Sequence, residues 1–255
     1  MLEATAIAEE SHFWFIGLRR NALMLLRAAL DGERPARILD CGAGTGRNLD
    51  WLQTLGWAVG LERSSVGLRF GRARGRRLVQ GTVAALPFPD DSMDVATSFD
   101  VLYGLDDATE RTAVSEMWRV LKPGGIVVIN VAALDSLRGS HSTLTREVRR
   151  YSKRRLRAIL TRAGFEVERL TFANMSTFPI TWLVRWRERM TRRADTASGR
   201  DLQVPPRPIN AIFNAVLALE ARAMRVVSLP IGTSLLCVAR KRAAGPSIGS
   251  DVRSA

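Results

Sequence analysis

The sequence predicts an α/β fold in which helices cover both faces of a largely parallel sheet. Three observations predict it. Short apolar runs alternate with amphipathic segments along the first half of the chain, the first apolar run leads into a glycine-rich loop, and 46% of the 255 residues are hydrophobic. Strands that alternate with helices need crossover connections, which place parallel strands side by side between layers of helices. The length suits one such domain with added segments.

The elements of the first half follow from the spacing of its apolar residues. Residues 12–30 carry apolar side chains at helical spacing and are predicted to form an N-terminal helix. Short apolar runs follow, with helical segments between them. The predicted strands span residues 38–41, 57–64, 76–81, 94–99 and 125–134, and the predicted helices span residues 47–56, 65–75 and 108–121.

The second half is less regular. It begins with an amphipathic, arginine-rich helix that ends at a glycine, followed by a segment of alternating apolar and charged residues. Two further helices are joined by a polar linker that contains prolines. The predicted helices span residues 152–164, 176–193 and 209–227, and the predicted strands span residues 165–173 and 234–241.

The net charge of +13 is unevenly distributed. Residues 138–200 hold 16 basic and 5 acidic side chains, which gives 16 − 5 = +11. An acidic partner is therefore expected at this part of the chain. Of the 38 basic residues only Lys122, Lys153 and Lys241 are lysines. A GC-rich coding sequence produces the same arginine bias, so this explanation stays open beside a functional one.

Composition also argues against a disulfide-stabilised, secreted or membrane-spanning protein. Cys41 and Cys237 are too few for a disulfide scaffold, and the absence of a Cys/His cluster argues against a structural zinc site. The N-terminus lacks a basic-then-apolar signal pattern. The longest uncharged run, residues 170–184, is shorter than the roughly 20 residues of a membrane span. The expected location is cytoplasmic, with peripheral membrane contact as an open alternative.

The glycine-rich loop is the strongest motif. It lies in the segment Leu39–Gly46, between a predicted strand and a predicted helix, and its three glycines let the backbone approach a ligand closely. Glu62 ends the next strand, 20 residues after Gly42, which is the spacing of an acid that binds ribose hydroxyls. A dinucleotide fingerprint has the spacing G-x-G-x-x-G, whereas Arg47 stands here where its third glycine would be.

The loop spacing resembles motif I of the class I S-adenosylmethionine-dependent methyltransferases. Residues 86–102, LPFPDDSMDVATSFDVL, are similar to the segment that leads into strand four of this family, and residues 116–130, EMWRVLKPGGIVVIN, to its helix, turn and strand five. Together these motifs cover about residues 36–133, and they indicate a methyltransferase of type 11. The resemblance implies a Rossmann-like, seven-stranded, mostly parallel sheet with an antiparallel last strand, an N-terminal helix and a helical insert.

The resemblance also implies S-adenosylmethionine as cofactor and assigns residues to it. The loop would hold the methionine end, Glu62 the ribose, and the residues after strand three the adenine. The cofactor residues implied are Asp40, Gly42, Ala43, Gly44, Gly46, Glu62, Arg63, Thr82, Val83, Phe99 and Asp100. Many relatives carry Asp where Thr82 stands. A hydroxyl accepts a hydrogen bond from the adenine amino group less strongly than a carboxylate does.

The acceptor side is predicted from scarce residue types and from charge. Tyr103 follows strand four and is a candidate for orienting the acceptor, while His141 is a candidate base near neutral pH. Arg149, Arg150 and Tyr151 are candidate acceptor-binding residues, because a guanidinium forms paired hydrogen bonds with an anionic group. The expected acceptor is a small molecule, a saccharide or a lipid-linked compound.

Two rival functions stay open at this stage. The first is a nucleotide-cofactor oxidoreductase, which the loop spacing disfavours. The second is binding or methylation of a nucleic acid, without any specific nucleic-acid motif to support it. The arginines available for phosphate contacts would be Arg69, Arg72, Arg74, Arg76 and Arg77.

The resemblance divides the chain into an N-terminal helical cap (1–35), a methyltransferase domain (36–241) and a disordered tail (242–255). A compact member of the family joins its last two strands by a short hairpin, whereas an insert of about residues 174–232 stands here. Trp182 and Trp186 alternate with arginines in it, a pattern typical of a membrane interface. A lid over the acceptor pocket and a dimer contact are alternative roles. The oligomeric state stays open.

Overall fold

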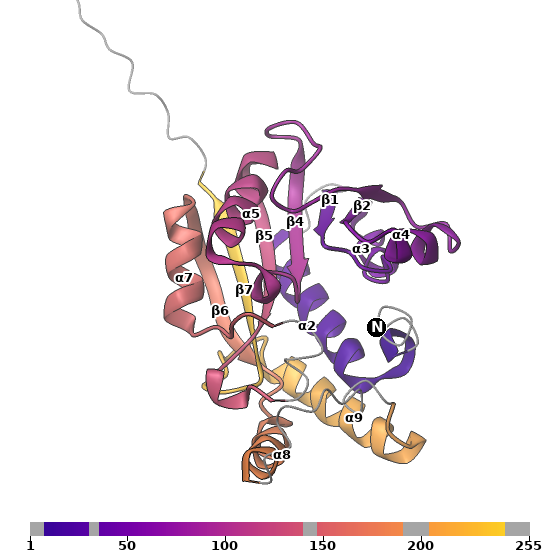
Figure 1. The fold of residues 1–255 in the computed structure, drawn as a ribbon, viewed down its shortest axis with the longest axis vertical. Coiled ribbons are helices and arrows are strands. Elements are labelled where there is room, and N and C mark those ends of the chain that lie inside the picture. Colours follow the sequence, from indigo (N-terminus) through magenta and orange to yellow (C-terminus); the bar gives the residue numbers. More distant parts are fainter. Residues whose placement is uncertain (1–7, 31–35, 140–146, 191–203, 243–255) are drawn as a thin grey trace, which may run out of the picture.

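A computed structural model describes residues 8–30, 36–139, 147–190 and 204–242. Within these ranges seven strands form one sheet in the order β3-β2-β1-β4-β5-β7-β6 (Figure 1). β7 runs antiparallel to both of its neighbours, β5 and β6, and the pairs among β1 to β5 are parallel. The strands are β1 (Ala36–Cys41), β2 (Gly56–Glu62), β3 (Leu78–Gln80), β4 (Met93–Phe99), β5 (Leu121–Ala132), β6 (Phe165–Ala173) and β7 (Ser234–Lys241). The predicted fold class, including the antiparallel last strand, is confirmed.

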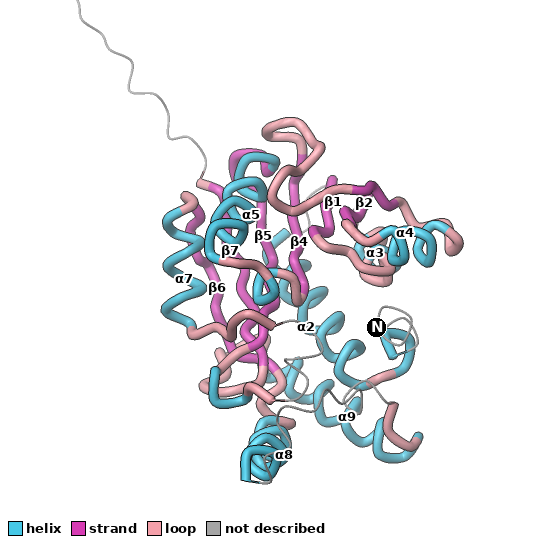
Figure 2. Tube along the Cα trace, viewed as in Figure 1, coloured by secondary structure: helices cyan, strands magenta, loops and turns pink. Residues whose placement is uncertain are grey.

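Helices cover both faces of the sheet. α5 packs beside α7 on one face, while α2 crosses the other (Figures 1 and 2). α8 and α9, the helices of the insert, lie at the end of the molecule toward which β4 points. The helices are α2 (Phe13–Leu30), α3 (Leu49–Leu52), α4 (Ser65–Arg72), α5 (Asp107–Val120), α7 (Lys153–Arg162), α8 (Phe178–Met190) and α9 (Arg207–Ala223), with 3₁₀ turns at Leu102–Gly104 and Asp135–Leu137.

One predicted helix is much shorter than expected. The prediction over residues 47–56 is wrong in its extent, because α3 spans only Leu49–Leu52. The reason is the sheet register. Gly56 already pairs with Ala36, so β2 begins there, and the glycine loop occupies the chain up to Asn48. Only a few residues are left for helix, and a helix this short contributes little dipole to the loop.

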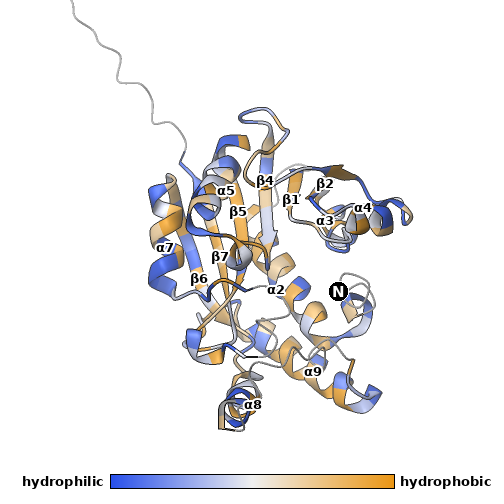
Figure 3. Ribbon diagram, in the orientation of Figure 1, coloured by the Kyte–Doolittle hydropathy of each residue, from blue (hydrophilic) through white to orange (hydrophobic). Residues whose placement is uncertain are grey.

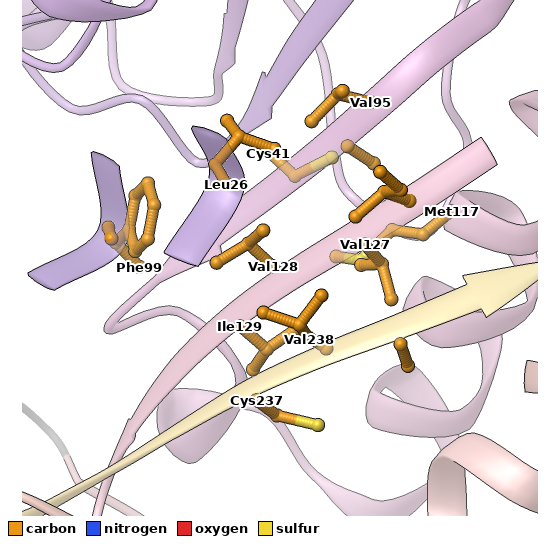
Figure 4. Close-up of a cluster of buried hydrophobic side chains, with 14 of the residues drawn as sticks. Leu26, Cys41, Val95, Phe99, Met117, Val127, Val128, Ile129, Cys237 and Val238 are labelled. Carbon is orange, nitrogen blue, oxygen red and sulfur yellow. The ribbon is translucent and has the colours of Figure 1, made fainter. Parts of the chain in front are cut away.

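The core lies on both faces of the central strands. β1, β4 and β5 are buried along most of their length, as expected for strands covered on both sides. Leu26 from α2 and Met117 from α5 belong to the same buried cluster as Val95 and Val128 of the sheet (Figure 4). Cys41 and Cys237 are buried free thiols, so they act as small apolar residues of this core.

A buried carboxylate attaches the segment after β5 to α5. The Glu110 side chain is 1% exposed and accepts a hydrogen bond from the hydroxyl of Tyr151. Arg155 donates to it at 2.5 Å, and a guanidinium nitrogen of Arg149 lies 3.3 Å away. Two arginines and a tyrosine thus compensate one buried charge. Within the described ranges, no helix combines the length and apolar content needed to cross a bilayer.

We expect Glu110→Ala to lower the free energy of unfolding by about 3 kcal/mol, because it removes the acceptor of the buried Tyr151 hydroxyl and the buried carboxylate that pairs with Arg149. Arg111→Ala, at an exposed position of the same helix, is the matched control and should change stability by about 0.5 kcal/mol or less. Denaturant unfolding followed by circular dichroism measures both. Equal midpoints for the two variants would contradict the structural role of Glu110.

Candidate functional site

The glycine loop turns sharply at the end of β1. Gly42, Gly44 and Gly46 all have positive φ, at 82°, 57° and 75°. A Cβ at Gly42 would lie 2.4 Å from Cγ2 of Val101, so no larger residue fits there. A Cβ at Gly44 would meet nothing within 4 Å. The loop therefore packs closely on the β4 side at Gly42, and at Gly44 it presents bare backbone to open space.

Glu62 fixes the shape of this loop. One carboxylate oxygen accepts from the backbone N–H of Gly44 at 2.8 Å, and the other accepts from that of Ser64 at 2.6 Å. A carboxylate has about four acceptor positions, so both oxygens keep capacity for a ligand's hydroxyl groups. The acid lies at the end of β2, beside the loop, as the sequence spacing predicts.

Asp40 lies beneath the loop with half of its carboxylate unpaired. The residue is 1% exposed, and its Oδ1 accepts from the hydroxyl of Thr97 at 2.8 Å. Oδ2 is buried without a hydrogen-bond partner. Burial raises the pKa of Asp40 to about 6, although the side chains of Thr97 and Asn48 lower it. A buried, unpaired carboxylate oxygen favours a cationic or hydrogen-bond-donating group bound next to it.

The N-terminal segment packs against the same loop. Glu9 accepts from the Thr45 hydroxyl at 2.6 Å, and Glu10 forms an ion pair with Arg47 at 3.2 Å. Burial raises the pKa of Glu9. His12 is 6% exposed, and its Nδ1 accepts from the N–H of Trp14 at the start of α2. The contact of Glu9 with the loop could not be predicted, because Glu9 lies outside every motif of the sequence.

Arg76 supports the loop from its other side. Its guanidinium is buried, binds both oxygens of Asp50 at 3.0 and 2.8 Å, and donates to the carbonyl of Thr45 at 3.0 Å. The alternative in which Arg76 contacts the phosphates of a nucleic acid is wrong for this residue, because its hydrogen bonds are used inside the protein. This role could not be predicted from the sequence, because a buried arginine cannot be told from the exposed arginines of the same charged segment.

The residues predicted for the adenine follow the ends of β2 and β3. Val83 is 8% exposed and belongs to the core, whereas Arg63 and Thr82 are exposed. The hydroxyl of Thr82 accepts from the N–H of Ala84 at 3.4 Å. In this structure neither Arg63 nor Thr82 is positioned by a strong contact. Their roles stay predictions that rest on the resemblance.

A second polar group lies at the ends of β4 and β5. Asp100 has φ of 60°, and its Oδ1 accepts from the side-chain amide of Asn130 at 2.9 Å. Burial raises the pKa of Asp100 to about 7, and Glu147 raises it further while Arg150 lowers it. Oδ1 of Asn130 is buried without a partner. Phe99, the residue before Asp100, packs 6.1 Å from the ring of Trp51.

Tyr103 and the segment after β5 complete this group. The carbonyl of Tyr103 accepts from the N–H groups of Val148 and Arg149, at 2.9 and 3.2 Å. Burial raises the pKa of Tyr103, and so do the charges of Asp100 and Glu147. Glu147 is paired with Arg150 at 2.6 Å, and both side chains are nearly buried. The structure thus brings together two of the candidate acceptor residues, Tyr103 and Arg150, with Glu147 and Asn130, which the sequence analysis did not single out.

Two of the predicted acceptor residues face elsewhere. Arg149 pairs with Asp107 at 2.9 Å and with Glu110, on the α5 side. Tyr151 is 1% exposed, and its hydroxyl donates to Glu110. Both side chains are held in the interface with α5 by this buried carboxylate, so the structure does not bring them to the strand ends. His141 lies outside the described residues.

Comparison with known proteins finds relatives mainly for the first half of the chain. Residues 39–129 match the family model described as a methyltransferase domain. A probable S-adenosylmethionine-dependent methyltransferase of Mycolicibacterium smegmatis is 32% identical over 166 residues, covering 62% of each chain. A demethylmenaquinone methyltransferase of Geobacillus stearothermophilus is 36% identical over 111 residues, covering 38% of this chain and 45% of that protein. The chain thus spans less than two thirds of the curated relatives it matches.

Solved structures share the fold over more of the chain. The structure of a SAM-dependent methyltransferase from Thermotoga maritima superposes with a TM-score of 0.56 and 20% sequence identity. The match covers 90% of this chain and 93% of that one. At this identity the likeness shows the fold alone.

The raised pKa of Asp100 predicts a pH dependence of stability. Its carboxyl binds a proton more tightly in the folded than in the unfolded protein, so ionisation between about pH 4 and pH 7 destabilises the fold. We expect Asp100→Asn to gain about 3 kcal/mol relative to the wild type between pH 4.5 and pH 8. Denaturant unfolding at the two pH values measures this, with the exposed Asp90→Asn as control. A difference independent of pH would contradict the prediction.

Proposed function

We propose, since this chain carries a class I S-adenosylmethionine-dependent methyltransferase domain, that it methylates a small apolar or lipid-linked acceptor. The observation that carries the proposal is the glycine loop, held by Glu62 above the unpaired carboxylate oxygen of Asp40. Both features lie at the carboxyl ends of parallel strands, where open α/β sheets bind their ligands.

The residues present fit the cofactor. The unpaired oxygen of Asp40 suits a hydrogen bond from the amino acid end of S-adenosylmethionine, and the remaining lone pairs of Glu62 suit its ribose hydroxyls. The open backbone of the loop admits close approach at Gly44. When bound, S-adenosylmethionine supplies an electrophilic methyl group on a positively charged sulfur. The adenine would lie beside Arg63, Thr82 and Val83, as the resemblance implies.

The resemblance assigns Phe99 and Asp100 to the cofactor, and we propose that the polar group at the ends of β4 and β5 also orients the acceptor. The pKa of Asp100 lies near 7, so its carboxylate can accept, near neutral pH, the proton that an acceptor hydroxyl group loses during methyl transfer. The unpaired Oδ1 of Asn130 accepts a hydrogen bond from the acceptor. The raised pKa of Tyr103 keeps its phenolic proton in place, so this hydroxyl positions the acceptor as a donor.

The apolar nature of the acceptor is supported by two observations. The relative from Geobacillus stearothermophilus is named for demethylmenaquinone, a quinone. The insert at this end of the molecule exposes many large apolar side chains, and we propose that it contacts lipid. An anionic group on the acceptor would meet Arg150, whose present partner is Glu147.

We expect the wild type to bind S-adenosylhomocysteine and not NADH in isothermal titration calorimetry. Glu62→Gln should weaken this binding at least tenfold, because the loop loses a charged acceptor at Gly44 and Ser64. The control Glu166→Gln changes an exposed acid on β6 and should leave the affinity within about twofold. Binding of NADH in place of S-adenosylhomocysteine would overturn the proposed function.

Asp100→Asn tests the acceptor side. With S-adenosylmethionine and the reduced, hydroquinone form of demethylmenaquinone as substrates, we expect kcat to fall by about 10²-fold, as is usual when a proton-accepting group is lost. The rise of the wild-type rate through about pH 7 should disappear, while the affinity for S-adenosylhomocysteine changes far less than kcat. An unchanged pH–rate profile would remove Asp100 from proton transfer.

A further inference from the structure

The helix α8 turns its apolar side outward and buries a polar side chain, the opposite of an ordinary surface helix. Its buried side carries Thr177, just before the helix, and Arg185, at 5% and 7% exposure. Its outward side carries large apolar residues, which an amphipathic helix would normally turn toward the core. The exposed apolar residues of α8 are Ile180, Trp182, Leu183, Val184, Trp186 and Met190, at 44–66% exposure.

Packing against the loop after β5 fixes this orientation. Arg185 donates to both carboxylate oxygens of Glu188, at 3.0 and 2.9 Å. A Cβ at Gly139 would lie 2.6 Å from Arg185 Cδ and from Glu188 Oε2, so the ion pair rests directly on that glycine. The polar side of α8 therefore has a close partner within the protein, and rotation of the helix to bury its tryptophans would break this contact.

The helix α9 lies at the same end of the molecule and carries a second set of exposed apolar residues. One side of α9 packs on α2, while Ile209, Ile212 and Leu219 on another side are 45%, 63% and 61% exposed. Val226, just after the helix, is 85% exposed. Figure 3 shows apolar colour along α9, and α8 lies at the same lower end of the view. Exposed large apolar side chains in this number mark an interaction site.

The charges around this surface select its partner. In residues 178–190 and 204–231, apart from the side chain of Arg189, the exposed charged side chains are Arg187, Arg207, Arg222 and Arg225. Glu220 is buried and accepts from Met175 and Ser176, and Glu188 is paired with Arg185. A second copy of the chain would bring like charges together, whereas an anionic lipid surface complements them.

We propose that α8 and α9 dock the protein on an anionic lipid surface. The tryptophans and aliphatic side chains enter the headgroup boundary, where tryptophan is favoured, and the arginines contact lipid phosphates. Asp100 and Asn130 lie near the ends of β4 and β5, and β4 points toward the end of the molecule where α8 and α9 lie (Figure 1). Docking therefore presents the acceptor side to the bilayer. The docking proposal does not depend on the proposed methyl transfer, because the experiment that tests it measures only binding to lipid.

Co-sedimentation with vesicles tests the proposal. We expect the full chain to sediment with phosphatidylcholine vesicles containing phosphatidylglycerol at low salt, and far less with pure phosphatidylcholine or at 0.5 M NaCl. The double variant Trp182→Ser, Trp186→Ser should lower the partition coefficient at least tenfold. Arg222→Glu with Arg225→Glu should abolish the preference for the anionic lipid. Because all four positions are exposed, the variants should keep the wild-type melting temperature.

The matched control reverses two exposed arginines elsewhere, Arg69→Glu with Arg77→Glu, which keeps the net charge of the second variant. It should bind anionic vesicles more than the Arg222 and Arg225 variant does. No sedimentation of the wild type, or equal binding by the tryptophan variant, would overturn the proposal. So would a wild-type dimer in analytical ultracentrifugation that the tryptophan variant turns into a monomer, because a second copy would then occupy the surface.

Discussion

The hydrogen bonds of the Glu62 carboxylate are the constraint on which the cofactor side depends. One side chain at the end of β2 accepts from the loop after β1 and from the turn before α4. The glycine loop cannot hold its own shape, because its positive φ angles and lack of side chains leave it many alternatives. Arg76 and Glu9 add support at Thr45. The open backbone at Gly44 is thereby held rigid next to the buried Asp40.

The acceptor side depends on a comparable use of buried charge. Asn130 joins β5 to Asp100 at the end of β4, and the Glu147–Arg150 pair closes the group. The segment that carries this pair is attached to α5 through Glu110. Most of these groups are compensated, while one oxygen each of Asp40 and Asn130 is not. Unpaired buried oxygens are costly and are found where a ligand completes them.

Much of the positive charge of residues 138–200 is paired with carboxylates inside the folded protein. Arg149, Arg150, Arg155 and Arg185 each have a carboxylate partner within the chain. A count of charges therefore overstates the basic surface available to a partner. The arginines that border the exposed apolar side chains of α8 and α9 are a smaller set, and three of them lie at residues 207–225. Exposed positive charge and exposed apolar side chains therefore occur together on α9 and just after it.

The sequence by itself determined the sheet and the ligand edge. Strand boundaries at residues 165–173 and 234–241, the glycine loop and the acid at Glu62 could be predicted because they follow from periodicity and short-range spacing. Only the tertiary structure decided the partners of Glu9, Arg76 and Glu110, and the outward direction of Trp182 and Trp186. These depend on contacts between residues far apart in the chain, and local patterns carry no information about which residues will meet. The outward apolar side of α8 is the clearest case, since its sequence alone left a membrane interface, a lid over the acceptor pocket and a dimer contact open.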